Sequence, residues 1–199
     1  MALFIPTYFS PISQYTSIVN SNNITFEIEE NYQKQSYRNR CYILGANGKQ
    51  LLNIPISNTN KSFGKLKLKE VLIEDSNWQR QHYKSLTTAY NHSPFFEFYK
   101  DDLQYIFKKK YKYLLDINID SFHFINEALD LSKEYDISKK YNDKVDDDYR
   151  YHADVKNTYK SKCIPYIQMF QDRNDFLKNL SILDLLFMEG PNSINFLEQ

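Results

Sequence analysis

The sequence predicts an α/β fold, a mixed sheet with flanking helices, and α+β is the alternative class. A short apolar run at 2–5 is followed by a segment of helical spacing and then by an alternating run at 24–29, which is the order strand, helix, strand. A hairpin pattern follows at 41–56, and several helical patterns come after it. Together these observations favour a sheet with helices packed against it.

The first three elements are read from apolar spacing and from proline. Ala2–Ile5 is expected to be a buried strand that Pro6 ends. Ser10 and Pro11 have the pattern of an N-cap and a first helical position, so a helix is expected over 11–21. Apolar and polar residues alternate from Ile24 to Glu29, which predicts a strand.

The middle of the chain predicts a hairpin and a further strand. Its two strands are expected at 41–44 and 51–56, and Asn47-Gly48 between them can supply the positive φ values of a tight turn. A polar loop is expected at 57–65. Alternation in the next segment predicts a strand over 66–73.

Helices dominate the expected second half. Asp75 or Ser76 is the predicted cap of a helix that begins near Trp78, and Ser93-Pro94 has the cap-plus-proline pattern of the next helix. The remaining expected elements are a helix over 120–134, a late strand over 164–170, and a buried helix over 180–187 that Gly190-Pro191 ends.

The length of 199 residues suits one domain, 1–199, that can bury roughly 70% of its unfolded surface without a disulfide or a metal. The least apolar part, 138–162, is expected to be a polar loop or lid, and a solvated loop without a role is the alternative. Equal numbers of basic and acidic residues, 25 each, argue against a nucleic-acid binder.

The expected location is the cytoplasm. Two cysteines, Cys41 and Cys163, suit a reduced compartment. The sequence has neither a secretory signal pattern nor an apolar run that approaches the roughly 18 residues of a membrane span. The four histidines lack metal-ligand spacing, so no metal site is expected, and no cofactor is assigned.

The polar stretch 30–43 is the predicted binding site. Arg38 and Arg40 lie on the same side if this segment is extended, and two guanidinium groups on one face can clamp a carboxylate or a phosphate. Lys34 adds a third cation, and Asn39 can hydrogen-bond a hydroxyl or an amide. A solvated strand edge is the alternative interpretation.

His82 is the candidate general base, on a helix that begins near Trp78, and a packing histidine is the alternative. Cys41 follows two arginines that can lower a thiol pKa, but its neighbours favour a buried, unreactive thiol. Asp184 and Glu189 are either an acid/base pair or ordinary polar positions of a helix.

Several short motifs resemble the WbqC-like protein family, and their order and spacing match over most of the chain. They are Pro6-x-Tyr8-Phe9 with Tyr15, Tyr32-x-Lys34, Arg38-Asn39-Arg40, Gly48, Ile54-Pro55-Ile56, Trp78-Gln79-Arg80-Gln81-His82, Ala89-Tyr90, Ser93-Pro94-Phe95-Phe96 and Asn179–Phe187 with Gly190-Pro191.

The resemblance implies a transferase in surface-polysaccharide (O-antigen) biosynthesis that passes glycine or another aminoacyl group to a sugar. A nucleotide-linked sugar or glycan precursor and an activated amino acid are the partners implied. Tyr8, Lys34, Arg38, Asn39, Arg40 and Trp78 are then the expected substrate-binding residues, and His82 is the expected catalytic residue. A non-catalytic protein that binds a glycan or a partner enzyme is the alternative, and a small nucleic-acid-associated protein is a third.

The site hypothesis makes one geometric prediction. The guanidinium groups of Arg38 and Arg40 should converge with Lys34 on a shared hollow, and the helix of Trp78 should help to line it.

Overall fold

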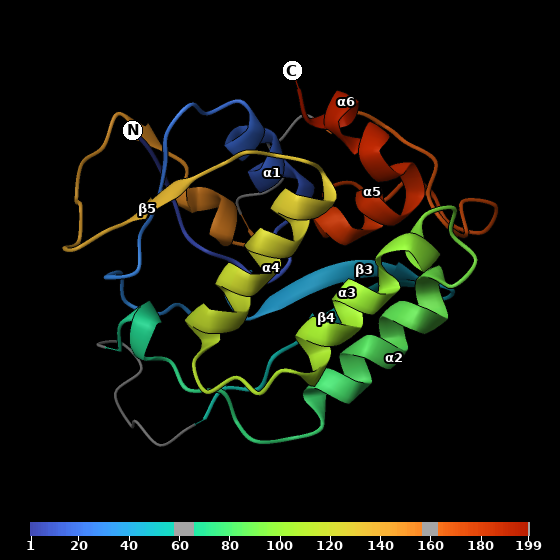
Figure 1. Ribbon diagram of the computed structural model, residues 1–199, viewed down its shortest axis with the longest axis horizontal. Coiled ribbons are helices and arrows are strands. Elements are labelled where there is room, and N and C mark those ends of the chain that lie inside the picture. The colour runs from blue at the N-terminus through green and yellow to red at the C-terminus, as the bar shows by residue number, and fades with distance from the viewer. Residues whose placement is uncertain (58–65, 157–162, 199) are drawn as a thin grey trace.

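The computed structural model describes residues 1–57, 66–156 and 163–198, and in these parts of the chain it confirms the α/β class. The strands form two separate sheets, one parallel with four strands and one antiparallel with two. Helices pack around both (Figure 1). None of the helices in the described parts of the chain is long and apolar enough to cross a membrane.

The four-stranded sheet has the order β5-β2-β1-β6, and all its strands run parallel. They are β1 (Ala2–Phe4), β2 (Ile24–Phe26), β5 (Tyr135–Ile137) and β6 (Asp147–Asp148). The predicted first two strands are therefore confirmed, although β2 is shorter than expected. All three residues of β1 are buried, as its apolar run predicts for a central strand.

The chain changes direction in this sheet at β1. It passes from β1 through α1 (Ile12–Val19) to β2 on one side, and after β5 it returns to β6 on the other side. In open parallel sheets, ligands bind outside the carboxyl ends of the strands. Here those ends lead into Pro6, Glu27, Ser138 and Tyr149.

The second sheet is the predicted hairpin of β3 (Arg40–Gly45) and β4 (Gly48–Asn53). Gly45 pairs with Gly48 across a two-residue turn, and Gly48 supplies the positive φ, 98°. Asn47, the other residue expected to do so, has no positive φ. Helices α2 (Trp78–Tyr90) and α5 (Ile182–Glu189) pack on β3.

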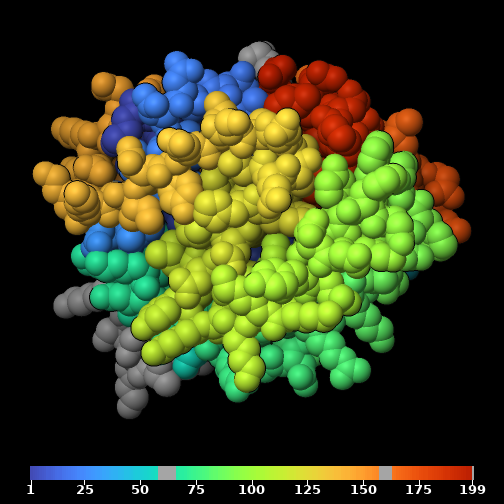
Figure 2. Space-filling view, in the orientation of Figure 1, coloured from blue at the N-terminus to red at the C-terminus, as the bar shows by residue number. Residues whose placement is uncertain are grey.

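Helices α2, α3 (Phe96–Lys108) and α4 (Leu114–Ala128) pack one against the next. In Figure 2, α3 and α4 cover much of the face toward the viewer. Near the C-terminus, α5 and α6 (Ile194–Leu197) lie against α1 (Figure 1). The described residues also include the short 3-10 helices η2 (Leu68–Glu70), η3 (Arg150–Ala153) and η5 (Gly190–Ser193).

Three predicted elements are wrong in the described residues. The segment 66–73 is built around η2 with single bridges at its ends, because Leu68 and Val71, three residues apart, are both turned into the core. The segment 164–170 has no regular structure. The helix expected over 120–134 is α4, and both of its ends lie six residues earlier than expected. Its buried face starts at Leu114, and a left-handed residue, Asp130, follows its end.

The predicted N-caps are also wrong. Pro11, Asn77 and Phe95 occupy the cap positions of α1, α2 and α3, and none of them caps through its side chain. The Ser93 hydroxyl instead donates to the carbonyl of Tyr90 and so closes the end of α2. The predicted final helix is confirmed as α5, capped by Ser181 and ended at Gly190, where a Cβ would lie 2.4 Å from Phe95 Cδ1.

The polar loop predicted at 57–65 lies, except for its first residue, outside the described residues. The same holds for the last six residues of the lid predicted at 138–162. Residues 138–156 contain β6 and η3. The function of this segment as a lid stays a prediction.

Candidate functional site

A cavity of about 630 Å³ lies beyond the carboxyl end of β2. The chain leaves the strand with Glu27, Ile28, Glu29 and Glu30, and so delivers carboxylates to the edge where α/β sheets bind ligands. The side chains that line the cavity are those of Glu29, Glu30, Asn31, Tyr32, Gln33, Lys67 and Tyr141. They are carboxylates, amides, phenols and one amine, a set that can hydrogen-bond a polyhydroxylated ligand.

Glu29 is the most strongly paired carboxylate of the cavity wall. Its side chain is 7% exposed and forms ion pairs with Lys67 and Lys69, which η2 brings to it from 40 residues away. Hydrogen bonds from Lys67 and Lys69 lower the pKa of Glu29. Lys67 and Lys69, whose alternation with apolar residues predicted a strand, therefore lie at η2 and pair with Glu29.

Arg38 is enclosed beside the cavity. Its side chain is 2% exposed, and its Nη2 lies 2.7 Å from Glu30 Oε2 on the cavity wall. Its Nε and Nη1 are buried without a hydrogen-bond partner among the described residues. A buried guanidinium with two unmatched donors is costly unless an acceptor reaches it.

Arg40 is half-buried, and its Nε is also buried without a partner in the described residues. Burial raises the pKa of Tyr32 to about 12, and the charges of Arg40 and Arg38 oppose this rise. Both guanidinium groups therefore act on the same phenol, and that phenol lines the cavity. Neither arginine is among the described residues that line the cavity, and their convergence with Lys34 on a shared hollow stays a prediction.

Two other predicted residues, Lys34 and Asn39, are not among the described residues that line the cavity. Lys34 is exposed. Asn39 uses its amide nitrogen within the hairpin, 2.9 Å from the carbonyl of Ile54 and 3.1 Å from Asn53 Oδ1, while its Oδ1 is buried without a partner among the described residues.

The predicted catalytic residue lies elsewhere, in an aromatic cluster of the core. His82 Nδ1 is 3.0 Å from the hydroxyl of Tyr8, and its ring packs on those of Trp78 and Phe107. Burial lowers the pKa of His82 to about 4, against a hydrogen bond with the backbone of Asn53 that raises it. The imidazole is neutral near pH 7.

The structure thus brings Tyr8, Trp78 and His82 together, but not onto the cavity. All three are 5% exposed or less, and none is among the described residues that line the cavity beside Arg38 and Arg40. The hypothesis also had the helix of Trp78 line the shared hollow. No residue of α2 is among the described residues that line this cavity. The roles predicted for these three side chains stay predictions.

Two further interpretations concern residues outside the cavity. Cys41 is buried, and burial raises the pKa of its thiol, which suits an unreactive core cysteine. Asp184 is wholly buried and accepts hydrogen bonds from the hydroxyls of Tyr90 and Tyr166, whereas Glu189 accepts one from Asn192. The two carboxyls therefore have separate partners.

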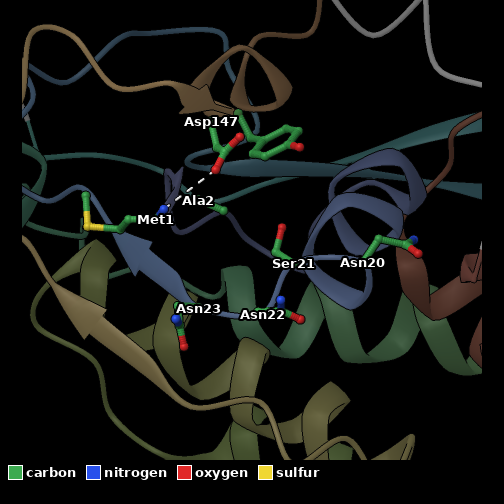
Figure 3. A pocket seen from close by; sticks show the side chains of 8 residues that line it. Met1, Ala2, Asn20, Ser21, Asn22, Asn23 and Asp147 are labelled. Carbon is green, nitrogen blue, oxygen red and sulfur yellow. Dashed lines mark ion pairs between the residues drawn. The ribbon is translucent and has the colours of Figure 1, made fainter.

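A second polar cavity, of about 330 Å³, lies at the opposite end of the sheet, beside the amino ends of β1 and β6 (Figure 3). Asparagines of the α1–β2 turn line it, and its one ion pair joins the amine of Met1 to Asp147, 3.6 Å apart. The described residues contain no group of three or more His, Cys, Asp or Glu side chains that could hold a metal ion.

The sequence-based reasoning missed Glu27, Glu29, Lys67, Tyr141 and Arg150. Glu27 and Glu29 lie within the run that predicted a strand over 24–29, and they stand beyond the carboxyl end of β2 because that strand ends at Phe26. No local signal marks Lys67 or Tyr141, since only the tertiary fold brings them to Glu29.

Comparison with known proteins gives one match. The model of the WbqC-like protein family matches residues 6–161, which is more than three quarters of the chain and includes the whole cavity. The C-terminal block of the predicted resemblance, 179–191, lies outside the matched range. No curated protein and no solved structure matches the chain.

Proposed function

The chain belongs to the WbqC-like protein family, and we propose that it is a transferase that binds a nucleotide-linked sugar or glycan precursor in the cavity beyond β2. The reaction we propose is aminoacyl transfer, with glycine as the first candidate, in the cytoplasmic assembly of a surface polysaccharide.

One observation carries the proposal. Arg38 and Arg40 both have buried N–H groups that find no acceptor in the described residues, and both act on Tyr32 in the cavity wall. Among the described residues, the Arg38 guanidinium pairs with the carboxylate of Glu30. The buried Nε of Arg40 has no partner among the described residues, and the diphosphate or carboxylate of a substrate would supply one and balance the charge of this guanidinium.

The two arginines have different roles in this proposal. Arg40 is half-buried, so it contacts the anionic group of the substrate directly. Arg38 is enclosed, so it contributes charge and holds Glu30 in the wall. The role assigned to exposed Lys34 is to attract the anion before it binds.

A second candidate function is a non-catalytic protein that binds the same class of ligand. It is favoured by the position of His82, whose side chain is 5% exposed and packs among Tyr8, Trp78 and Phe107. A general base has to reach the proton that it removes. The base predicted for the transfer would then need the aromatic cluster to open.

The test combines binding with turnover in the purified full-length chain. Calorimetric titration with UDP-glucose and UDP-N-acetylglucosamine measures binding, and mass spectrometry after incubation with glycyl-adenylate or glycyl-tRNA measures transfer. We expect Arg40→Ala to weaken binding of the sugar nucleotides at least about tenfold, equivalent to roughly 1.4 kcal/mol. Arg173→Ala is the matched control, because that guanidinium is 69% exposed and pairs only with the neighbouring Asp172.

The outcomes separate the two functions. Binding together with a glycylated product supports the transferase, and binding without product under every donor supports the binding protein. If wild type binds none of these ligands, or if the Arg40 and Arg173 variants bind equally well, the proposed site is wrong. His82→Gln then tests the base: equal turnover in that variant would remove its catalytic role.

A further inference from the structure

A segment that we call the strap, residues 138–150, runs from the end of β5 to η3 and carries Tyr141 to the cavity. We propose that Tyr141 is the platform on which a pyranose ring of the substrate stacks, and that Glu27 and Arg150 are the positioning residues that hold it there. This inference rests on the proposed function and names the part of the ligand that the cavity takes.

Glu27 fastens the strap from the sheet side. It is fully buried at the carboxyl end of β2, and one oxygen, Oε1, accepts from the Ser138 hydroxyl at 2.6 Å and from the backbone N–H of Glu29 at 2.8 Å. The other oxygen, Oε2, accepts from the backbone N–H of Asn142 at 3.1 Å. A single carboxylate thus fixes the strap on both sides of Tyr141 and also fixes the backbone of Glu29 in the cavity wall.

Arg150 fastens the strap from the other end. Its side chain is 12% exposed, and its Nη1 donates to the carbonyl of Asn142 at 2.8 Å. Asp148 orients the guanidinium through Nε at 2.9 Å and Nη2 at 2.6 Å. The residue after Tyr141 is therefore held at both its N–H and its C=O.

The Tyr141 ring itself is both held and open. The Arg150 guanidinium carbon lies 5.2 Å from the ring centroid, which is the distance of a cation–π contact. The side chain nevertheless remains 49% exposed, although it lines the cavity. A phenol that is fixed by its neighbours and left half-open has a free face for a ligand, and little further rotamer entropy is lost when the ligand binds.

The rest of the lining indicates which ligand. Tyr141 offers an apolar ring face, and around the same cavity stand the carboxylates of Glu29 and Glu30 and the amides of Asn31 and Gln33. A sugar ring has an apolar C–H surface and several hydroxyls that both donate and accept hydrogen bonds, and these groups match that set. A flat nucleobase has fewer hydrogen-bonding groups along its edge than a sugar ring offers to so many polar side chains. The cavity of about 630 Å³ is of ordinary size for a small-ligand site.

The test measures binding of four probes to the full-length chain by calorimetric titration: UDP-glucose, UDP-N-acetylglucosamine, UDP and free glucose. We expect Tyr141→Ala to raise the Kd for the two UDP-sugars about tenfold, and to change the Kd for UDP less than about twofold. Tyr141→Phe keeps the ring and should stay within about twofold of wild type. Tyr105→Ala is the control, because that tyrosine is 72% exposed on α3 and is not among the described residues that line this cavity.

Glu27→Gln tests the positioning role. It should weaken binding of the UDP-sugars severalfold, and it should also increase hydrogen exchange at the amide of Asn142, a readout that loss of a direct ligand contact would not change. Unchanged exchange at Asn142 would remove the role of Glu27 in holding the strap.

Each outcome has a separate meaning. If wild type binds the UDP-sugars and Tyr141→Ala binds them as well as Tyr105→Ala does, the platform is overturned while the proposed function stands. If Tyr141→Ala weakens UDP and UDP-glucose equally, the ring stacks on the base, and the sugar assignment is wrong. If wild type binds no probe, the proposed function fails first and this inference with it.

Discussion

Glu29 at the edge of the sheet and Asp184 in the core are carboxylates with opposite partners. Glu29 is 7% exposed and is paired with two lysines. Asp184 is wholly buried, and its hydrogen-bond donors among the described residues are neutral: Tyr90 Oη and Tyr166 Oη, each 2.5 Å away, and Gln168 Nε2 at 3.3 Å.

The pKa values follow from these partners. Hydrogen bonds from Lys67 and Lys69 lower the pKa of Glu29, whereas burial raises the pKa of Asp184 to about 6, although its three donors act to lower it. Cationic partners thus keep the Glu29 carboxylate charged beside the cavity, and neutral donors only limit the cost of burying Asp184.

The two carboxylates also lie in regions of different kinds, a packed core and the wall of a cavity. The Asp184 network joins α5 to α2 through Tyr90 and to the irregular segment 163–180 through Tyr166 and Gln168. It holds the irregular segment, which has no regular hydrogen-bond ladder of its own, to these two helices. The Glu29 region instead surrounds an open cavity. Four predictions test this contrast.

The largest effect is expected for Asp184→Ala. This change leaves the hydroxyls of Tyr90 and Tyr166 in the core without their acceptor, and each unmatched group costs about 1–3 kcal/mol. We expect the free energy of unfolding in urea to fall by roughly 3–5 kcal/mol. Asp101→Ala, at an exposed position on α3, is the control and should change it by less than about 0.5 kcal/mol. Similar losses in the two variants would contradict the role of the network.

The pH dependence of Asp184 comes next. Its pKa rises from 3.8 to about 6 on folding, so the folded protein holds this proton more tightly than the unfolded chain does. The stabilisation is complete below pH 3.8 and is lost as the pH rises through about 6. Relative to Asp184→Asn, wild type should lose roughly 2 kcal/mol of unfolding free energy between about pH 4 and pH 7.

The quantity to measure is the difference in unfolding free energy between wild type and Asp184→Asn. Two histidines change the stability with pH in the opposite direction from Asp184. Burial lowers the pKa of both His82 and His152 to about 4, so their contribution is present above the ordinary value of 6.5 and is lost as the pH falls toward 4. Both histidines are retained in Asp184→Asn and cancel in the difference. A flat difference curve would show that Asp184 does not titrate in this range.

A smaller and opposite dependence is expected at the sheet edge. Folding lowers the pKa of Glu29 from 4.5, so its stabilisation is present above pH 4.5 and is lost as the pH falls through the lowered value. Glu29→Gln should therefore have a lower Tm than wild type near pH 7, and the two should approach each other in acid. A deficit that grows in acid would reverse the sign and contradict the ion pairing.

The smallest effect is expected for Lys69→Met. Lys69 is 38% exposed, so its ion pair with Glu29 is screened by water and salt. We expect a loss of at most about 1 kcal/mol in unfolding free energy, and a smaller loss at high salt. Arg173→Met, in an exposed pair, should have almost no effect at either salt concentration. A loss as large as that of Asp184→Ala would remove the contrast between the two regions.

The local pattern of the sequence was sufficient for the class of the fold and for much of its framework. The apolar run at β1, the hairpin at 40–53 and the periodicity of α2, α3 and α5 are properties of neighbouring residues, and all are present in the structure. Arg38 lies in a turn before β3, so the alternation of an extended segment, on which its predicted convergence with Arg40 depended, does not apply to it.

The caps, the η2 turn and the cavity were decided by tertiary structure. Ser10 and Ser93 have the local features of an N-cap, but their hydroxyls bind Thr7 and the carbonyl of Tyr90 instead. Glu29, Lys67 and Tyr141 meet only because the chain folds β2, η2 and the strap toward one edge of the sheet. Periodicity indicates which face of a helix or strand is buried. Which side chain lies opposite that face, when it comes from more than 100 residues away in the sequence, depends on the packing of the whole chain and not on the local sequence.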